Sequence, residues 1–274
     1  MLDIPYFLSE YTSFKATALA NRYITNSHIE PLLNSLSSQF CQSLLGTSEA
    51  GMPIHGVQVG TGSKRILIWS QMHGNESTTT KALFDLFNYF ELPNSETLLE
   101  ACTLFIIPIL NPDGAEVYTR LNGRQIDLNR DAKALSQSES KILRTAYNNF
   151  KPHFCFNLHD QRTIYGSDKD VNPSGLSFLS PCYDSKGSVN SSRSKSMYII
   201  EHIYSHLSNV IKDRIRLYND DYNENCFGDH FQMKGSSTIL FESGFFEKDY
   251  NREITRKYMF FSIVIALELI SNNI

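Results

Sequence analysis

The sequence has no apolar segment of the length that crosses a membrane. Its longest apolar run, at residues 258–267, is interrupted by Ser262, whereas a membrane-spanning helix needs about 20 apolar residues. We interpret this run as a buried C-terminal helix. The N-terminal segment carries an early acidic residue, Asp3, and lacks the apolar core of a signal peptide. These absences predict no membrane partner and favour a cytoplasmic location.

Cysteine pairs and an excess of basic charge are also missing. The five cysteines lie far apart and form no C-x-x-C pair, so we expect mostly buried, reduced thiols and no disulfide framework. The 25 Lys and Arg residues are outnumbered by 29 Asp and Glu residues, which gives a formal net charge of −4. Because a polyanion favours a basic surface, no nucleic-acid partner is expected.

The sequence does contain alternating apolar strands and helical patterns. Helices are predicted at 27–45, from 76 to about 90, and at about 195–212. Strands are predicted at about 53–59, 65–70, 102–110, 153–160 and 237–244. This alternation predicts a single α/β domain over residues 1–274, with a helical N-terminal segment at about 1–50. Its sheet is expected to be mixed, mostly parallel and twisted, with helices on both faces.

Four polar residues lie at or near the ends of the predicted strands, where ligands gather in such sheets. His73 and Glu76 follow the strand at 65–70, His159 is near the end of 153–160, and Glu242 lies within 237–244. Two His and one carboxylate are common protein ligands of a catalytic zinc, with water in the fourth position. Glu242 would then be free to act as general base. The structural alternative is a favourable helix-start Glu beside a hydrogen-bonded His.

An ordered series of motifs favours the metal site. H-x-x-E at 73–76 is followed by N-P-D-G at 111–114, an Arg at 120 and D-L-N-R at 127–130, and then by His159 and Glu242. In this order, over about residues 50–250, the sequence closely resembles the zinc carboxypeptidase family, the funnelin metallocarboxypeptidases. The most similar form is the compact bacterial branch that includes murein peptide amidases.

The resemblance implies a role for each matched residue. One Zn²⁺ per chain is expected on His73, Glu76 and His159, with Glu242 as the general base. Arg120 would polarise the scissile carbonyl and stabilise the oxyanion.

The resemblance also implies substrate-binding residues. Asn129 and Arg130 would hold the terminal carboxylate of the substrate. Tyr222 is expected to close over the substrate, with Tyr218 as a rival. Asp229 is expected to line the side-chain pocket, where an acid would favour a basic or amino-bearing residue.

The sequence departs from the family pattern in two further places. Asn75 stands where digestive members carry a substrate-binding Arg, and the segment from Asp113 to Asn129 is short. The short segment indicates a more open pocket.

The leading functional hypothesis is a zinc metallocarboxypeptidase or peptide amidase. Its substrate would be a peptide, or a murein peptide, with a free C-terminal carboxylate. One alternative is a zinc deacylase of the aspartoacylase or succinylglutamate desuccinylase type. The other is a protein that binds peptide carboxylates without hydrolysing them.

Overall fold

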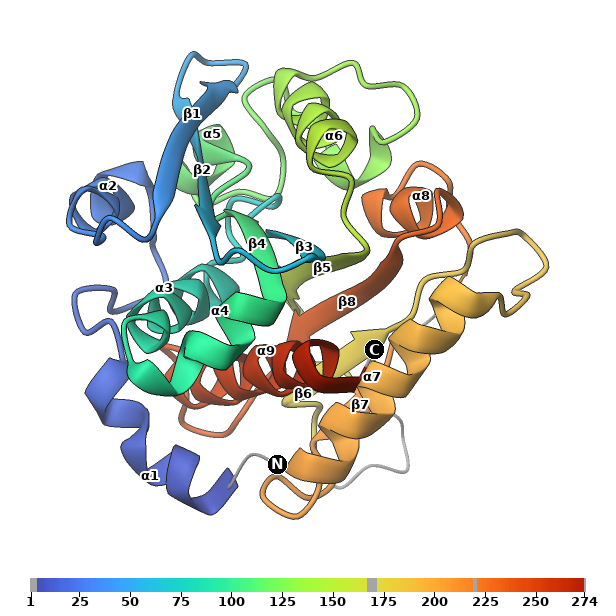
Figure 1. The fold of residues 1–274 in the computed structure, drawn as a ribbon. Coiled ribbons are helices and arrows are strands. Elements are labelled where there is room, and N and C mark those ends of the chain that lie inside the picture. Colours follow the sequence, from blue (N-terminus) through green and yellow to red (C-terminus); the bar gives the residue numbers. More distant parts are fainter. Residues whose placement is uncertain (1–3, 167–171, 219–220, 274) are drawn as a thin grey trace.

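Eight strands form one mixed sheet through the centre of the molecule (Figure 1). The computed structural model describes residues 4–166, 172–218 and 221–273. Within them the strand order is β1-β2-β4-β3-β5-β8-β6-β7. The central strands β4, β3, β5 and β8 are parallel to one another, while β1, β2 and β6 pair antiparallel with their inner neighbours. The predicted mixed, mostly parallel sheet is therefore confirmed. The strands are β1 (Cys41–Thr47), β2 (Pro53–Val59), β3 (Lys64–Trp69), β4 (Cys102–Ile107), β5 (Phe154–Asp160), β6 (Leu176–Leu179), β7 (Ile215–Leu217) and β8 (Ser237–Ser243).

Helices cover both faces of this sheet, and successive side chains of a strand enter two different apolar cores. On β3, Ile66 and Ile68 belong to the core beneath α1, α3, α7 and α9. Leu67 and Trp69 belong to the core beneath α6 and α8. The helices are α1 (Ile4–Phe14), α2 (Asn26–Asn34), α3 (Thr78–Phe90), α4 (Glu96–Ala101), α5 (Pro112–Glu116), α6 (Ser138–Phe150), α7 (Ser191–Leu207), α8 (Phe227–Met233) and α9 (Glu253–Asn273), with short 3-10 turns at Pro93–Ser95 and Leu128–Arg130.

The prediction of one helix over 27–45 is wrong. The helix α2 ends at Asn34, and β1 begins at Cys41 and pairs with β2. Long-range pairing here outweighs the local apolar spacing, so that the segment at about 1–50 contains a strand as well as two helices. The short edge strand β7 has only three residues and was not predicted. The strand predicted at 102–110 ends at Ile107, before Pro108, which cannot donate a ladder hydrogen bond.

A buried ion pair joins the N-terminal segment to α3 and α9. The guanidinium of Arg256 donates to both carboxylate oxygens of Asp85, at 2.8 and 2.6 Å. The same carboxylate accepts from the Tyr11 hydroxyl and the Ala16 amide. Both charged side chains are inaccessible to solvent. This network satisfies the buried charges with hydrogen bonds, as an ion pair in an apolar core requires.

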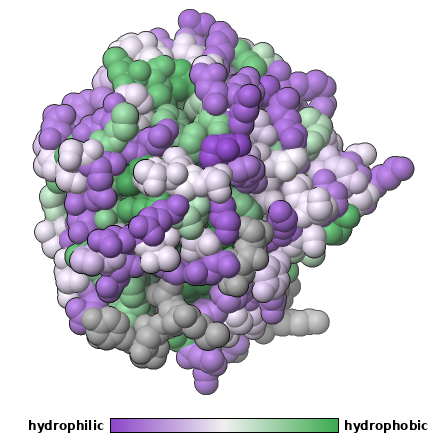
Figure 2. All heavy atoms as spheres, in the orientation of Figure 1, coloured by the Kyte–Doolittle hydropathy of each residue, from purple (hydrophilic) through white to green (hydrophobic). Residues whose placement is uncertain are grey.

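The visible surface is a mixture of polar and apolar residues. In Figure 2, hydrophilic residues interleave with smaller apolar areas across the face shown. In the described part of the chain, none of the helices combines the length and the apolar character needed to span a membrane. The apolar run at 258–267 lies in the buried α9, as predicted. All five cysteines are free thiols: three are buried, Cys226 is half-buried and Cys41 is exposed.

Candidate metal and catalytic site

The three predicted metal ligands converge at the carboxyl end of the central strands. His73 and Glu76 lie in the segment between β3 and α3, and His159 lies near the end of β5. Glu76 bridges the two imidazoles: its Oε1 is 2.9 Å from Nδ1 of His73, and its Oε2 is 2.8 Å from Nδ1 of His159. The two Nδ1 atoms are 3.2 Å apart. All three residues are buried, and each offers a ligand atom within 4.8 Å of the others.

This donor set fits zinc. Ligand atoms at tetrahedral positions about 2.0–2.1 Å from a zinc ion lie about 3.4 Å from one another. The spacings among His73, Glu76 and His159 are close to that value. Nε2 of His73 is 3.1 Å from Oδ1 of Asp127, a contact that directs the Nδ1 lone pair into the cluster. A buried pair of imidazoles with an anionic oxygen therefore suits a divalent cation.

The N-P-D-G motif supports the segment that carries the predicted ligands His73 and Glu76. A Cβ atom on Gly74 would lie 1.9 Å from the backbone of Gly114, so only glycine permits this close approach. The side chain of Asn111 accepts from the amide of Gly114 and donates to the carbonyls of Met72 and Arg120. The motif thus fixes the positions of His73 and Arg120 relative to each other.

Two carboxyl groups of the cluster are held in the anionic form. Burial acts to raise the pKa of Glu76, but His73 and His159 outweigh it, and the pKa is well below its usual range. Burial also opposes ionisation of Asp127, yet the contact with His73 and the charge of Arg120 lower its pKa well below the usual range. Two anionic carboxylates beside two imidazoles make the site electrostatically suited to a cation.

The pKa of Glu242 is shifted in the opposite direction. It lies on β8 directly beside His159 of β5 in the strand register. Burial, followed by the nearby carboxylates of Glu76 and Asp160, raises its pKa well above the usual range. A carboxyl group beside the predicted metal ligands is in a position to exchange a proton with a water bound there, as the role predicted for Glu242 requires.

A single cavity of about 330 Å³ brings most of the predicted site residues together. The three predicted ligands and Glu242 line it. Arg120 lies at its edge, with one guanidinium nitrogen 3.2 Å from Nδ1 of His73 and another donating to Asp127. The remaining predicted site residues on its wall are Asn129, Arg130 and Asp229.

Asn129 and Arg130 retain free donors. Oδ1 of Asn129 accepts from the amide of Phe227 at the start of α8, while its Nδ2 makes no hydrogen bond within the described residues. One nitrogen of Arg130 donates to the carbonyl of Asn129 at 2.7 Å and contacts the Cys226 sulfur. The rest of this exposed guanidinium is available, in the arrangement that binds a carboxylate with two hydrogen bonds.

The cavity wall holds Tyr218 rather than Tyr222 among its described residues. The hydroxyl of Tyr222 instead points to the sulfur of Met233, at 3.5 Å. Tyr218 is therefore the better placed of the two tyrosines in this conformation.

Asp229 lies in the first turn of α8, where its Oδ1 accepts from the amide of Asn223. Burial raises the pKa of Asp229 to about 6. A Cβ atom on the neighbouring Gly228 would lie 3.6 Å from the side chain of Asn157. This part of the cavity therefore combines a buried acid with the side-chain amide of Asn157.

Two polar residues of the site were not singled out from the sequence. Asp127 positions His73 and Arg120, and the signal for it was present, since it is the first residue of the D-L-N-R motif. Arg162 lines the cavity, donating to the carbonyl of Asn75 at 3.1 Å and to the Tyr118 hydroxyl at 3.0 Å. It places a guanidinium beside the position at which the expected Arg is replaced by Asn75, and nothing in the linear pattern marked it.

Comparison with known proteins agrees with this geometry. The chain is 27% identical over 115 residues to the probable carboxypeptidase 2 of Arthroderma benhamiae, which covers 40% of this chain and 22% of that protein. It is 33% identical over 89 residues to gamma-D-glutamyl-L-diamino acid endopeptidase 1 of Lysinibacillus sphaericus, covering 29% of this chain and 22% of that protein. The matches thus span only about a fifth of the length of these relatives.

Solved structures share the fold. A metallo-carboxypeptidase from Pseudomonas aeruginosa, in complex with (2-guanidinoethylmercapto)succinic acid, superimposes with a TM-score of 0.72. The two proteins are 16% identical, and the match covers 90% of this chain and 69% of that one. The sequence profile of the zinc carboxypeptidase family matches residues 26–220, and the resemblance seen in the motifs is confirmed. The chain therefore belongs to the zinc carboxypeptidase family.

Proposed function

We propose that this chain is a zinc-dependent carboxypeptidase that hydrolyses the last peptide bond of substrates with a free C-terminal carboxylate. The observation that carries the proposal is one cavity that contains a buried His–Glu–His cluster, the carboxyl group of Glu242, and the side chains of Asn129 and Arg130. These are the parts that such a hydrolysis requires, and each comes from a different segment of the chain.

Each residue of the site has its own role in the proposed reaction. A zinc ion held by His73, Glu76 and His159 would supply Lewis-acid activation of water and of the scissile carbonyl. Glu242 accepts the proton of the attacking water and then delivers it to the leaving amine. Arg120 donates to the oxygen on which negative charge develops, which lowers the barrier more than it stabilises the bound substrate.

The substrate is positioned by its charged ends. Arg130 and the free Nδ2 of Asn129 bind the terminal carboxylate. Asp229 lies on the same cavity wall, and its burial makes ionisation costly without a partner. A cationic side chain in the substrate would supply that partner. We therefore favour substrates that end in a basic or amino-bearing residue, including murein peptides that end in a diamino acid.

The names of two similar proteins agree with this preference. The Lysinibacillus sphaericus relative is named for a diamino acid, and the Pseudomonas aeruginosa structure holds a molecule that carries a guanidino group and a succinic acid. Both chemistries combine a cationic group with carboxylates, and the cavity offers an acid, Asp229, and a guanidinium, Arg130, to groups of these charges.

Metal analysis combined with a substrate screen tests the proposal. We expect one equivalent of zinc and release of a C-terminal Lys or diaminopimelate from peptides. Release only from N-acyl amino acids would instead identify a deacylase. Binding of peptides with no bound zinc and no turnover would identify a non-catalytic protein.

The variant Glu242→Gln tests the assigned proton acceptor. It keeps the shape of the side chain and leaves the three metal ligands in place, so zinc content should be unchanged. Loss of the general base should lower kcat by about 10²–10⁴-fold. The matched control is Glu100→Gln, an exposed residue of α4, which should not change kcat. Near wild-type turnover by Glu242→Gln would contradict the mechanism.

A further inference from the structure

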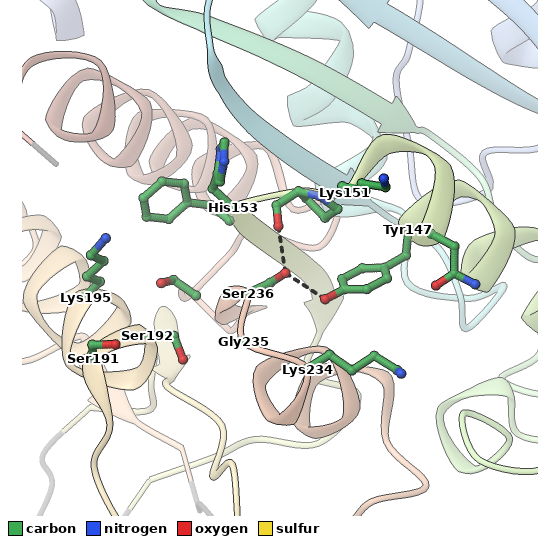
Figure 3. A pocket seen from close by; sticks show the side chains of 13 residues that line it. Tyr147, Lys151, His153, Ser191, Ser192, Lys195, Lys234, Gly235 and Ser236 are labelled. Carbon is green, nitrogen blue, oxygen red and sulfur yellow. Dashed lines mark hydrogen bonds between the residues drawn. The ribbon is translucent and has the colours of Figure 1, made fainter.

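A second polar cavity lies at the opposite edge of the sheet from the catalytic site. Its volume is about 420 Å³, and it is enclosed by the end of α6, the start of α7 and the segment that follows α8 (Figure 3). Phe154 and Ser237, the first residues of β5 and β8, lie in its wall. His159 lies five residues further along β5, which at about 3.3 Å per residue places the two sites about 17 Å apart.

The charged side chains that line this cavity are basic. Lys151, Lys195 and Lys234 line it and are exposed. None of their ammonium groups makes a hydrogen bond or an ion pair within the described residues. No described Asp or Glu lines the cavity. Burial, Arg65 and Lys195 lower the pKa of His153, another lining residue. The field here is positive, although the chain as a whole carries a net charge of −4.

Residues with uncharged donors also line the cavity. Ser237 is only 3% exposed and lines the cavity, yet its hydroxyl has no hydrogen-bond partner among the described residues. The 17-residue helix α7 begins here, and the side chain of its N-cap Asn190 accepts from the amide of Arg193. The amides of the first two helical residues, Ser191 and Ser192, have no intrahelical acceptor. An anion at this helix end would also be favoured by the helix dipole.

We propose that this cavity binds a phosphate-class oxyanion, either free phosphate or the phosphate group of a monoester. A tetrahedral dianion accepts hydrogen bonds from a hydroxyl, from helix-start amides and from lysines, and the cavity supplies all three kinds of donor. The cavity is larger than a phosphate group and lies in the size range of small-molecule sites, which favours the monoester. In Figure 3, the ring of Tyr147 forms part of the wall, where it could contact the organic part of such a ligand.

Isothermal titration calorimetry on the full, zinc-loaded chain tests this assignment. The probes are inorganic phosphate, glucose 6-phosphate and uncharged glucose. We expect saturable binding of glucose 6-phosphate with Kd below about 1 mM, and none of glucose. Tighter binding of the ester than of inorganic phosphate identifies a monoester site, while equal affinities identify free phosphate as the ligand. Either outcome supports an oxyanion site.

Two variants locate the binding. Ser237→Ala removes a hydroxyl without changing charge, and Lys195→Gln removes one ammonium group; each should raise Kd at least about fivefold. The control Lys212→Gln makes the same charge change beyond the far end of α7 and should change Kd less than twofold. Binding that both site variants leave unchanged would place the anion elsewhere, for instance on the catalytic zinc, and would overturn the proposal. Absence of saturable binding up to 10 mM probe (roughly the weakest affinity worth assigning to a site) would overturn it equally.

Discussion

Replacement of Asp229 by Asn should stabilise the protein at neutral pH. The carboxyl group is buried in the wall of the cavity that His73, Glu76 and His159 line, and burial raises its pKa from the ordinary 3.8 to about 6. The folded state therefore holds this proton more tightly than the unfolded chain does. Ionisation of Asp229 carries a free-energy cost that is absent below about pH 3.8, grows up to about pH 6 and is constant above it. Asn keeps the acceptor oxygen that receives the amide of Asn223 but cannot ionise.

The size of the effect follows from the pKa. A difference of about two pH units corresponds to about 3 kcal/mol. Compared with the wild type, Asp229→Asn should gain about 3 kcal/mol at pH 7.5 but only about 1 kcal/mol at pH 4.5. Urea unfolding of both proteins across this range measures the difference, and Glu100→Gln serves as a control that should show no such pH trend.

Two outcomes would refute the reasoning. A variant that is no more stable than the wild type at pH 7.5 would mean that ionised Asp229 is already compensated. A gain that is the same at every pH would mean that it comes from packing and not from charge. The variant could instead gain stability and also show a higher KM for substrates ending in Lys. That result would mean that Asp229 lowers the stability of the fold but contributes to substrate binding.

Two further substitutions test the supports of the site and of the fold. Asp127→Ala removes the partner of Nε2 of His73 and should weaken zinc binding about 10- to 100-fold; competition with a chelator measures this, and unchanged affinity would show that His73 is oriented without Asp127. Asp85→Ala leaves the buried guanidinium of Arg256 without its carboxylate and should lower the free energy of unfolding by about 3–5 kcal/mol. Denaturant unfolding measures this loss. A loss below about 1 kcal/mol would mean that water or backbone groups replace the carboxylate.

The grouping of His73, Glu76 and His159 could be predicted because these residues lie at strand ends in an order that the family shares. The strand ends brought His73, Glu76 and His159 to one edge of the sheet, and the ordered family motifs favoured a metal site over a structural role for them. The strand β1 could not be predicted in this way, since its partner β2 is what makes the segment extended. The residues of the cavity wall could not be predicted either, because Arg162 is brought beside Asn75 by the packing of segments 87 positions apart.

The cluster of lysines around the second cavity could not be predicted from the sequence either. Lys151, Lys195 and Lys234 stand in three unrelated segments, and each resembles an ordinary solvated lysine in the sequence. Only the fold brings them to one opening without a neutralising acid. Local patterns carry information about cores and strand ends, whereas a shared electric field depends on the complete arrangement of the chain.

The pairing of β5 with β8 constrains how this chain can change its length. His159 and Glu242 are register partners, and their neighbours Leu158 and Phe241 point into the core on the other face of the sheet. One residue inserted or deleted within either strand would exchange the two faces and turn the side chain of His159 or Glu242 into that core. Loops between the elements can lengthen or shorten without this penalty. Length variation among functional relatives should therefore be confined to loops, while the spacing within these two strands stays invariant.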